Sequence, residues 1–178
     1  MKVLGIFRGF PGLGRVVSGV SILEVLRDTY GFKVRAVSYL QGNEYLKTKG
    51  FELLNEATSF DYCSIGLLPT NQLAKDIYTL IKEFCPDIII IDGEPLMIQS
   101  LRISYPNIKL VTLLNPSDVE NEANDKEAMD YFNASFQMAD LAIIHGNRKV
   151  TTKRNYKHII SIPTIIRREV IEIKRKPT

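Results

Sequence analysis

The stretch KVLGIFRGFPGLGR, Lys2–Arg15, decides the fold of this chain. Its first part, residues 2–7, is a short apolar run typical of a buried strand, and a helical run over Val16–Tyr30 follows it. Glycines between a strand and a helix allow a tight turn that presents free backbone N–H groups and the positive end of a helix dipole. We therefore expect phosphate or sugar oxygens to bind at this turn, around Gly12 and Gly14.

The glycine turn matches neither of two common nucleotide-binding fingerprints. Counting from Gly12, Val17 replaces the third glycine of a dinucleotide loop, and Ser38 and Tyr39 end the next strand where an acidic residue would bind the ribose. A P-loop ends in Gly-Lys-Ser/Thr, whereas residues 14–16 read Gly-Arg-Val. The turn alone leaves open whether its glycines bind a ligand or only bring the helix close to the strand.

Composition indicates one folded domain. The chain has 178 residues, is 45% hydrophobic and carries a net charge of +3, which suffices for a core and lacks the charge excess of disordered proteins. The apolar stretch around Ile88–Ile91 is far shorter than a membrane span, and Met1 leads into a strand rather than a signal sequence. We expect a cytoplasmic location. With Cys63, Cys85 and two histidines, we expect no disulfide framework, metal centre or cofactor.

The segment over residues 148–176 is the basic part of the chain. It holds ten Lys or Arg against two Glu, a net charge of +8, whereas the preceding part, with thirteen basic and eighteen acidic residues, has −5. Such a segment is typical of a solvated tail or an interdomain linker, and it also fits contact with an anionic membrane surface. No nucleic-acid-binding signature accompanies it, so no nucleic acid partner is expected. We divide the chain into a domain over 1–162 and a basic tail or linker over 163–178.

Strands and helices alternate along the sequence. Strands are expected at 2–7, 33–39, 51–54, 87–91, 108–114, 140–144 and 158–162, and helices at 16–30, 43–49, 71–84, 95–104 and 119–138. Short apolar strands that alternate with helices predict a parallel sheet covered on both faces. The expected fold is a three-layer α/β/α Rossmann-like domain with a parallel sheet of about six or seven strands and the first strand central.

Two carboxylates directly follow one of the buried strands. Ligands of such sheets bind beyond the carboxyl ends of the strands, and Asp92 and Glu94 flank Gly93 at one of these ends. Pro95 comes next and is well suited to begin a helix, where an acidic side chain is also favoured. One carboxylate is therefore expected to cap that helix, and the other to face the cleft.

Four sequence segments resemble GT-B glycosyltransferases, especially the bacterial UDP-N-acetylglucosamine transferases. GLGRVVS at 12–18 and GFKV at 31–34 resemble the opening of that family, where Gly-x-Gly-His, a helix and a Gly-His-x-Val strand are common. PDIIIIDGEPL at 86–96 is similar to the family's Pro-Asp, hydrophobic strand, Asp-x-Glu-Pro segment. IPTIIRRE at 162–169 is similar to the segment that leads out of the first domain.

The resemblance implies one half of a two-domain enzyme. In GT-B enzymes the first Rossmann-like domain chiefly binds the acceptor, and the second binds most of the nucleotide sugar. The chain is then the acceptor-binding domain of a hexosyltransferase that moves a sugar to a hydroxyl, incomplete without a donor-binding domain. The implied partners are a nucleotide-sugar donor and a small-molecule or lipid-linked acceptor, with peripheral contact at the inner membrane face. A noncatalytic binding or partner-docking subunit, or a domain like a sugar-nucleotide epimerase, are the alternatives.

The chain departs from the family at the expected base. Arg15 stands where the family often has His, and an arginine stays protonated in proteins. Glu94, or else Asp92, is therefore the expected catalytic base, and His145 is the next candidate for the proton.

The remaining polar residues at strand ends are expected to bind ligand. The backbone amides at Gly12 and Gly14, together with Arg15, are expected to hold a phosphate of the donor or of a lipid-linked acceptor. Asn115 and Ser117 follow the strand expected at 108–114 and are expected to orient the acceptor, and His145, after the strand expected at 140–144, is also expected to bind the acceptor or a phosphate.

Overall fold

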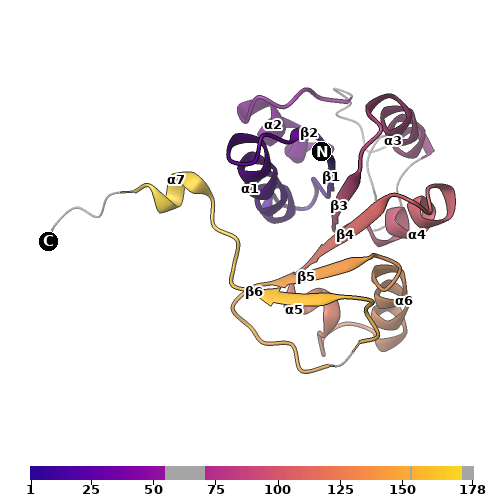
Figure 1. Ribbon diagram of the computed structural model, residues 1–178. Coiled ribbons are helices and arrows are strands. Elements are labelled where there is room, and N and C mark those ends of the chain that lie inside the picture. The colour runs from indigo at the N-terminus through magenta and orange to yellow at the C-terminus, as the bar shows by residue number, and fades with distance from the viewer. Residues whose placement is uncertain (55–70, 153, 174–178) are drawn as a thin grey trace, which may run out of the picture.

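The computed structural model describes residues 1–54, 71–152 and 154–173 (Figure 1). The strands are β1 (Lys2–Phe7), β2 (Lys33–Val37), β3 (Ile88–Asp92), β4 (Lys109–Leu114), β5 (Leu141–His145) and β6 (Ile159–Ile162). The helices are α1 (Gly14–Asp28), α2 (Gln41–Thr48), α3 (Asn71–Phe84), α4 (Pro95–Ser104), α5 (Pro116–Val119), α6 (Lys126–Phe136) and α7 (Arg168–Ile171).

The strands form one six-stranded sheet in the order β2-β1-β3-β4-β5-β6, and every neighbouring pair is parallel. Figure 1 shows α1 and α2 on one side of the sheet and α3, α4 and α6 on the other. The predicted Rossmann-like α/β fold is thus confirmed. The expectation that the first strand is central was wrong, since β1 lies second from an edge. β3 pairs with β1 on the side opposite to β2, and β4, β5 and β6 follow it in order toward the other edge of the sheet.

Two expected elements differ from those observed. Residues 51–54 form no strand, and the apolar side chains of Phe51, Leu53 and Leu54 pack against the core from irregular backbone. The helix expected over 119–138 covers only Lys126–Phe136, as α6, and residues 120–125 link it to the short helix α5. The Asp125 carboxylate accepts the backbone N–H of Ala128 at 2.9 Å, which caps the start of α6 and separates it from α5.

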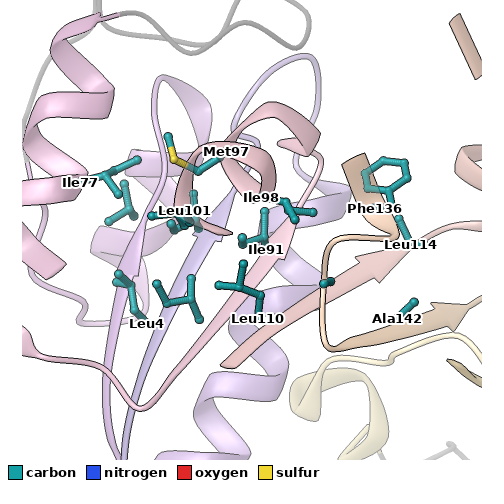
Figure 2. Close-up of a cluster of buried hydrophobic side chains, with 14 of the residues drawn as sticks. Leu4, Ile77, Ile91, Met97, Ile98, Leu101, Leu110, Leu114, Phe136 and Ala142 are labelled. Carbon is teal, nitrogen blue, oxygen red and sulfur yellow. The ribbon is translucent and has the colours of Figure 1, made fainter. Parts of the chain in front are cut away.

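The core has two layers, one on each face of the sheet. Alternate strand residues point to opposite faces, as the pleat requires. Figure 2 shows the layer that packs against α3, α4 and α6, which includes Leu4, Ile77, Ile91, Ile98, Leu101, Leu110 and Phe136. The other layer joins Val3, Phe7, Ile90 and Leu113 to the buried side of α1. A Cβ atom at Gly19 of α1 would overlap the Phe7 ring, so this glycine lets the helix pack directly on β1.

The chain after β6 returns toward α1 (Figure 1). There the Glu169 carboxylate forms an ion pair with Lys49. Lys49 Nζ also lies 3.4 Å from Glu24 Oε1. Large apolar side chains of this segment, such as Ile166 and Ile171, are exposed. The domain boundary at residue 162 stays a prediction. Within the described part of the chain, no helix is both long enough and apolar enough to cross a membrane.

Candidate functional site

Charged residues from distant parts of the chain meet at the carboxyl edge of the sheet. Arg15, in the first turn of α1, lies between Asp92 at the end of β3 and Asp118 of α5. Its Nη1 is 2.6 Å from Asp92 Oδ1, and its Nη2 is 2.6 Å from Asp118 Oδ1. Burial alone would lower the pKa of Arg15, but the two carboxylates outweigh it and raise that pKa above its ordinary value.

Asp92 is fully buried behind this arginine. Desolvation raises the pKa of Asp92 to about 7, although the Arg15 charge acts in the opposite direction. Its Oδ2 atom has no hydrogen-bond partner among the described residues. Burial thus favours the neutral form of Asp92, and the Arg15 charge favours the ionised form.

Glu94 is buried, with only 2% of its surface exposed. Its Oε1 accepts a hydrogen bond from the Tyr39 hydroxyl at 2.6 Å and lies 3.9 Å from Arg8 Nε. Arg8 also donates to the carbonyl of Gly93. Glu94 is the N-cap residue of α4, but its side chain makes no capping hydrogen bond, and Asp92 bonds to Arg15 instead. The expectation that one of the two carboxylates caps this helix was wrong. Asp92 bonds to an arginine of another element, and Glu94 accepts a hydrogen bond from a tyrosine and lies near a second arginine.

Gly93 allows the arginines to approach the end of β3. Its φ is +82°, which favours glycine, and a Cβ atom there would lie 2.5 Å from Arg15 Cδ.

His145 ends β5 on the same side of the sheet as Asp92. Only 4% of its surface is exposed, and neither ring nitrogen has a hydrogen-bond partner among the described residues. Burial lowers the pKa of His145, Arg15 lowers it further, and Asp118 opposes both. The imidazole is therefore neutral at pH 7.

Two cavities lie on either side of Arg15. The first, which we call the α6 cavity, has a volume of about 180 Å³ and is lined by Arg8, Arg15, Gly93, Pro95, Ser117, Asp118, Asn124, Met129, Phe132 and Phe136. The second, the α1 cavity, has a volume of about 310 Å³ and is lined by Pro11, Gly14, Arg15, Ser18, Asn115, Pro116, His145, Gly146 and Thr164. Arg15 lines both cavities, whereas Met129, Phe132 and Phe136 line the α6 cavity and His145 lines the α1 cavity.

The structure distributes the predicted site residues between these cavities. Ser117 lines the α6 cavity, Gly14, Asn115 and His145 line the α1 cavity, and Arg15 lines both.

Three predicted site residues line neither cavity. They are Gly12, Asp92 and Glu94. Glu94 instead lines a small cavity of about 10 Å³, together with Tyr39 and Met97.

Asp118 belongs to this charged cluster although the sequence did not single it out. It lies three residues after Asn115, whose backbone N–H it accepts at 2.8 Å, and this spacing is that of a capping box directly after a strand. The apolar wall of the α6 cavity was also missed, although Met129, Phe132 and Phe136 have the spacing of one helix face.

Comparisons with known proteins bear on the fold. A scan against protein-family models and a search of curated proteins both found no match. Among solved structures, the chain is similar to the spinosyn forosaminyltransferase SpnP, with a TM-score of 0.57 and 14% identity over 99% of this chain and 56% of that one. It is similar to the glycosyltransferase SsfS6 of Streptomyces sp. SF2575, with a TM-score of 0.54 and 12% identity over 99% of this chain and 60% of the other.

A third solved structure agrees with these two. A UGT transferase from Siraitia grosvenorii in complex with UDP has a TM-score of 0.52 and 9% identity, over 80% of this chain and 44% of that protein. Over the aligned residues, this chain has the same fold as these three solved structures. The chain spans about half the length of these proteins, which supports the GT-B resemblance at the level of the fold. The finer likeness to UDP-N-acetylglucosamine transferases stays a prediction.

Proposed function

We propose that this chain is the acceptor-binding domain of a nucleotide-sugar-dependent glycosyltransferase, and that transfer requires a second, donor-binding domain. The observation that carries the proposal is the α6 cavity at the carboxyl edge of the sheet, where α/β domains bind their ligands. Support comes from the likeness of nearly the whole chain to half of two glycosyltransferases. UDP in the Siraitia grosvenorii complex supports a nucleotide-sugar donor. A cytoplasmic location with peripheral membrane contact stays a prediction.

Sugar transfer to a hydroxyl needs a proton acceptor beside the nucleophile. Asp118 lines the α6 cavity, and its Oδ1 accepts one hydrogen bond from Arg15, so a lone pair remains for an acceptor hydroxyl. Glu94 and Asp92, the carboxylates that the sequence favoured, lie behind Arg8 and Arg15. We propose that Asp118 accepts the proton and that Glu94 and Asp92 position the arginines.

We propose that the donor phosphates bind in the α1 cavity. The first hydrogen bond within α1 runs from the Val17 N–H to the Leu13 carbonyl, and no side chain caps the helix. The backbone amides of the first turn, beginning at Gly14, are therefore available to a phosphate, which the helix dipole also favours. Asn115 and His145 line the same cavity and would orient the ligand.

Reconstitution tests this proposal. We expect no turnover of a labelled nucleotide sugar by this chain alone, and product only when a donor-binding half is added. Robust turnover by the isolated chain would contradict the two-domain proposal. A noncatalytic binding subunit is the second candidate, because both guanidinium groups of the site already face carboxylates. Ligand binding without turnover in every reconstituted pair would favour that candidate.

A further inference from the structure

We infer that the acceptor group bound in the α6 cavity is an uncharged ring that carries a hydroxyl, and not the phosphate of a lipid-linked acceptor. This inference rests on the proposed function, because it names the acceptor of the same site. The charges, the apolar side chains and the volume of the cavity each support it.

The charges of the cavity disfavour an anion. Among the described residues that line it, the cations are Arg8 and Arg15. Arg15 makes three hydrogen bonds of 2.6 to 3.1 Å to Asp92 and Asp118, and Arg8 bonds to a carbonyl and faces Glu94. A phosphate would have to displace Asp118 from Arg15 or lie beside its charge, and like charges at one site oppose binding.

The apolar side chains of the cavity suit an apolar ring. Met129, Phe132 and Phe136 lie on one face of α6 and form one wall, and Pro95 at the start of α4 adds to the apolar lining. Aromatic and thioether side chains pack well against rings. The Asp118 carboxylate lines the same cavity and would accept a hydrogen bond from the ring hydroxyl.

The volume limits the bound group to about one ring. The cavity holds about 180 Å³. A water molecule occupies about 30 Å³ of liquid, and most pockets for drug-sized ligands have roughly 300 Å³ or more. One six-membered ring with its hydroxyl therefore fills the cavity, and any larger part of the acceptor lies outside it.

Three probes that share ring size test the inference on the full chain: phenol, cyclohexanol and phenyl phosphate, each titrated into isotope-labelled protein and followed by NMR. We expect phenol and cyclohexanol to shift signals of the cavity residues and to compete, and phenyl phosphate to bind at least about tenfold more weakly. Equal or tighter binding of phenyl phosphate to the unaltered chain would overturn the inference. This comparison needs no variant, so it stands even where a substitution disturbs folding.

Variants of α6 locate the probes. Phe132→Ala should weaken phenol binding by about tenfold, because it removes apolar contact area from the wall. Lys126→Ala is the control on the same helix, since this side chain is exposed and does not line the cavity, and it should leave binding unchanged. Phenol binding that is insensitive to Phe132→Ala in folded protein would overturn the inference.

Asp118→Asn tests the charge argument. The substitution removes one carboxylate from Arg15, so the affinity for phenyl phosphate relative to phenol should rise by about tenfold. An unchanged ratio would overturn the argument from charge. Ring-alcohol binding without transfer in any reconstituted pair contradicts the proposed function alone. Transfer to a phosphate-bearing acceptor held in this cavity overturns the inference and leaves the proposed function intact.

Discussion

At the scale of single residues, the site depends on how three carboxylates share two arginines. Asp92 and Asp118 hold Arg15, and Glu94 faces Arg8 and Tyr39. Of these three carboxylates, Asp118 lines the α6 cavity, and Asp92 and Glu94 do not. The chemistry of the site therefore follows from which of the carboxylates a ligand can reach, and not from their number.

Asp92 should make stability depend on pH. Its pKa is about 7 in the folded chain and near 4 when unfolded, so the folded state binds the extra proton between these values. The stability from Asp92 is present below pH 4 and is lost as the pH rises through 7. Asp92→Asn stays neutral, so its free energy of unfolding should rise relative to the unaltered chain from pH 5 to pH 7.5. Urea denaturation at both pH values measures this difference.

His145 acts in the opposite direction in the same pH range. Its pKa is lowered in the folded chain, so its contribution to stability grows as the pH rises toward and beyond its ordinary value. If His145 titrates alike in the Asp92→Asn variant and in the unaltered chain, its contribution cancels when the free energies of unfolding of the two proteins are subtracted. A difference that stays constant with pH would show that Asp92 is ionised throughout.

The proton acceptor can be identified by a pair of isosteric substitutions in the reconstituted enzyme. Asp118→Asn should lower kcat by roughly a hundredfold or more, because it removes the carboxylate that lines the acceptor cavity. Glu94→Gln retains the shape of a buried side chain beside Tyr39 and should lower kcat by less than about tenfold. Initial rates at saturating substrate give both values. The reverse order would restore Glu94 as the base that the sequence indicated.

At the scale of elements, the position of α1 on the sheet determines where Arg15 lies. The helix packs on β1 through Gly19 and Phe7, and this close contact brings its first turn over the end of β3. Because Gly19 has no Cβ atom where it meets the Phe7 ring, α1 lies close to the sheet, and its first turn reaches Asp92.

Gly19→Ala should destabilise the chain by about 1–3 kcal/mol, because the added methyl overlaps the Phe7 ring in a packed layer. Gly14→Ala is the matched control on the same helix, since a Cβ there meets no atom within 4 Å. The control should be neutral or slightly stabilising, as alanine favours helix more than glycine. Thermal unfolding followed by circular dichroism compares them, and equal melting temperatures would refute the packing argument.

At the scale of the whole molecule, the described chain is one sheet with two core layers and a C-terminal segment that contributes little to either. Side chains from residue 163 to residue 173 are exposed or half-buried, and the Lys49–Glu169 pair at the surface is the kind that contributes about 1 kcal/mol or less.

Removal of residues 163–178 should therefore leave a folded domain. We expect the melting temperature of the shortened chain to lie within about 5 °C of the full chain, because few buried contacts are lost. Circular dichroism and calorimetry would show this. Loss of cooperative unfolding would place the domain boundary later than residue 162.

The sequence by itself determined most of the elements and the edge at which the site lies. Short apolar runs and helical stretches of period 3.6 are local patterns, so β1, α3 and α4 have the bounds that the sequence predicts. Only the tertiary structure decided which charges meet. Arg15 bonds to residues 77 and 103 positions away, Asp92 and Asp118. Such pairs depend on strand order and on side-chain direction across the sheet, which no local pattern encodes.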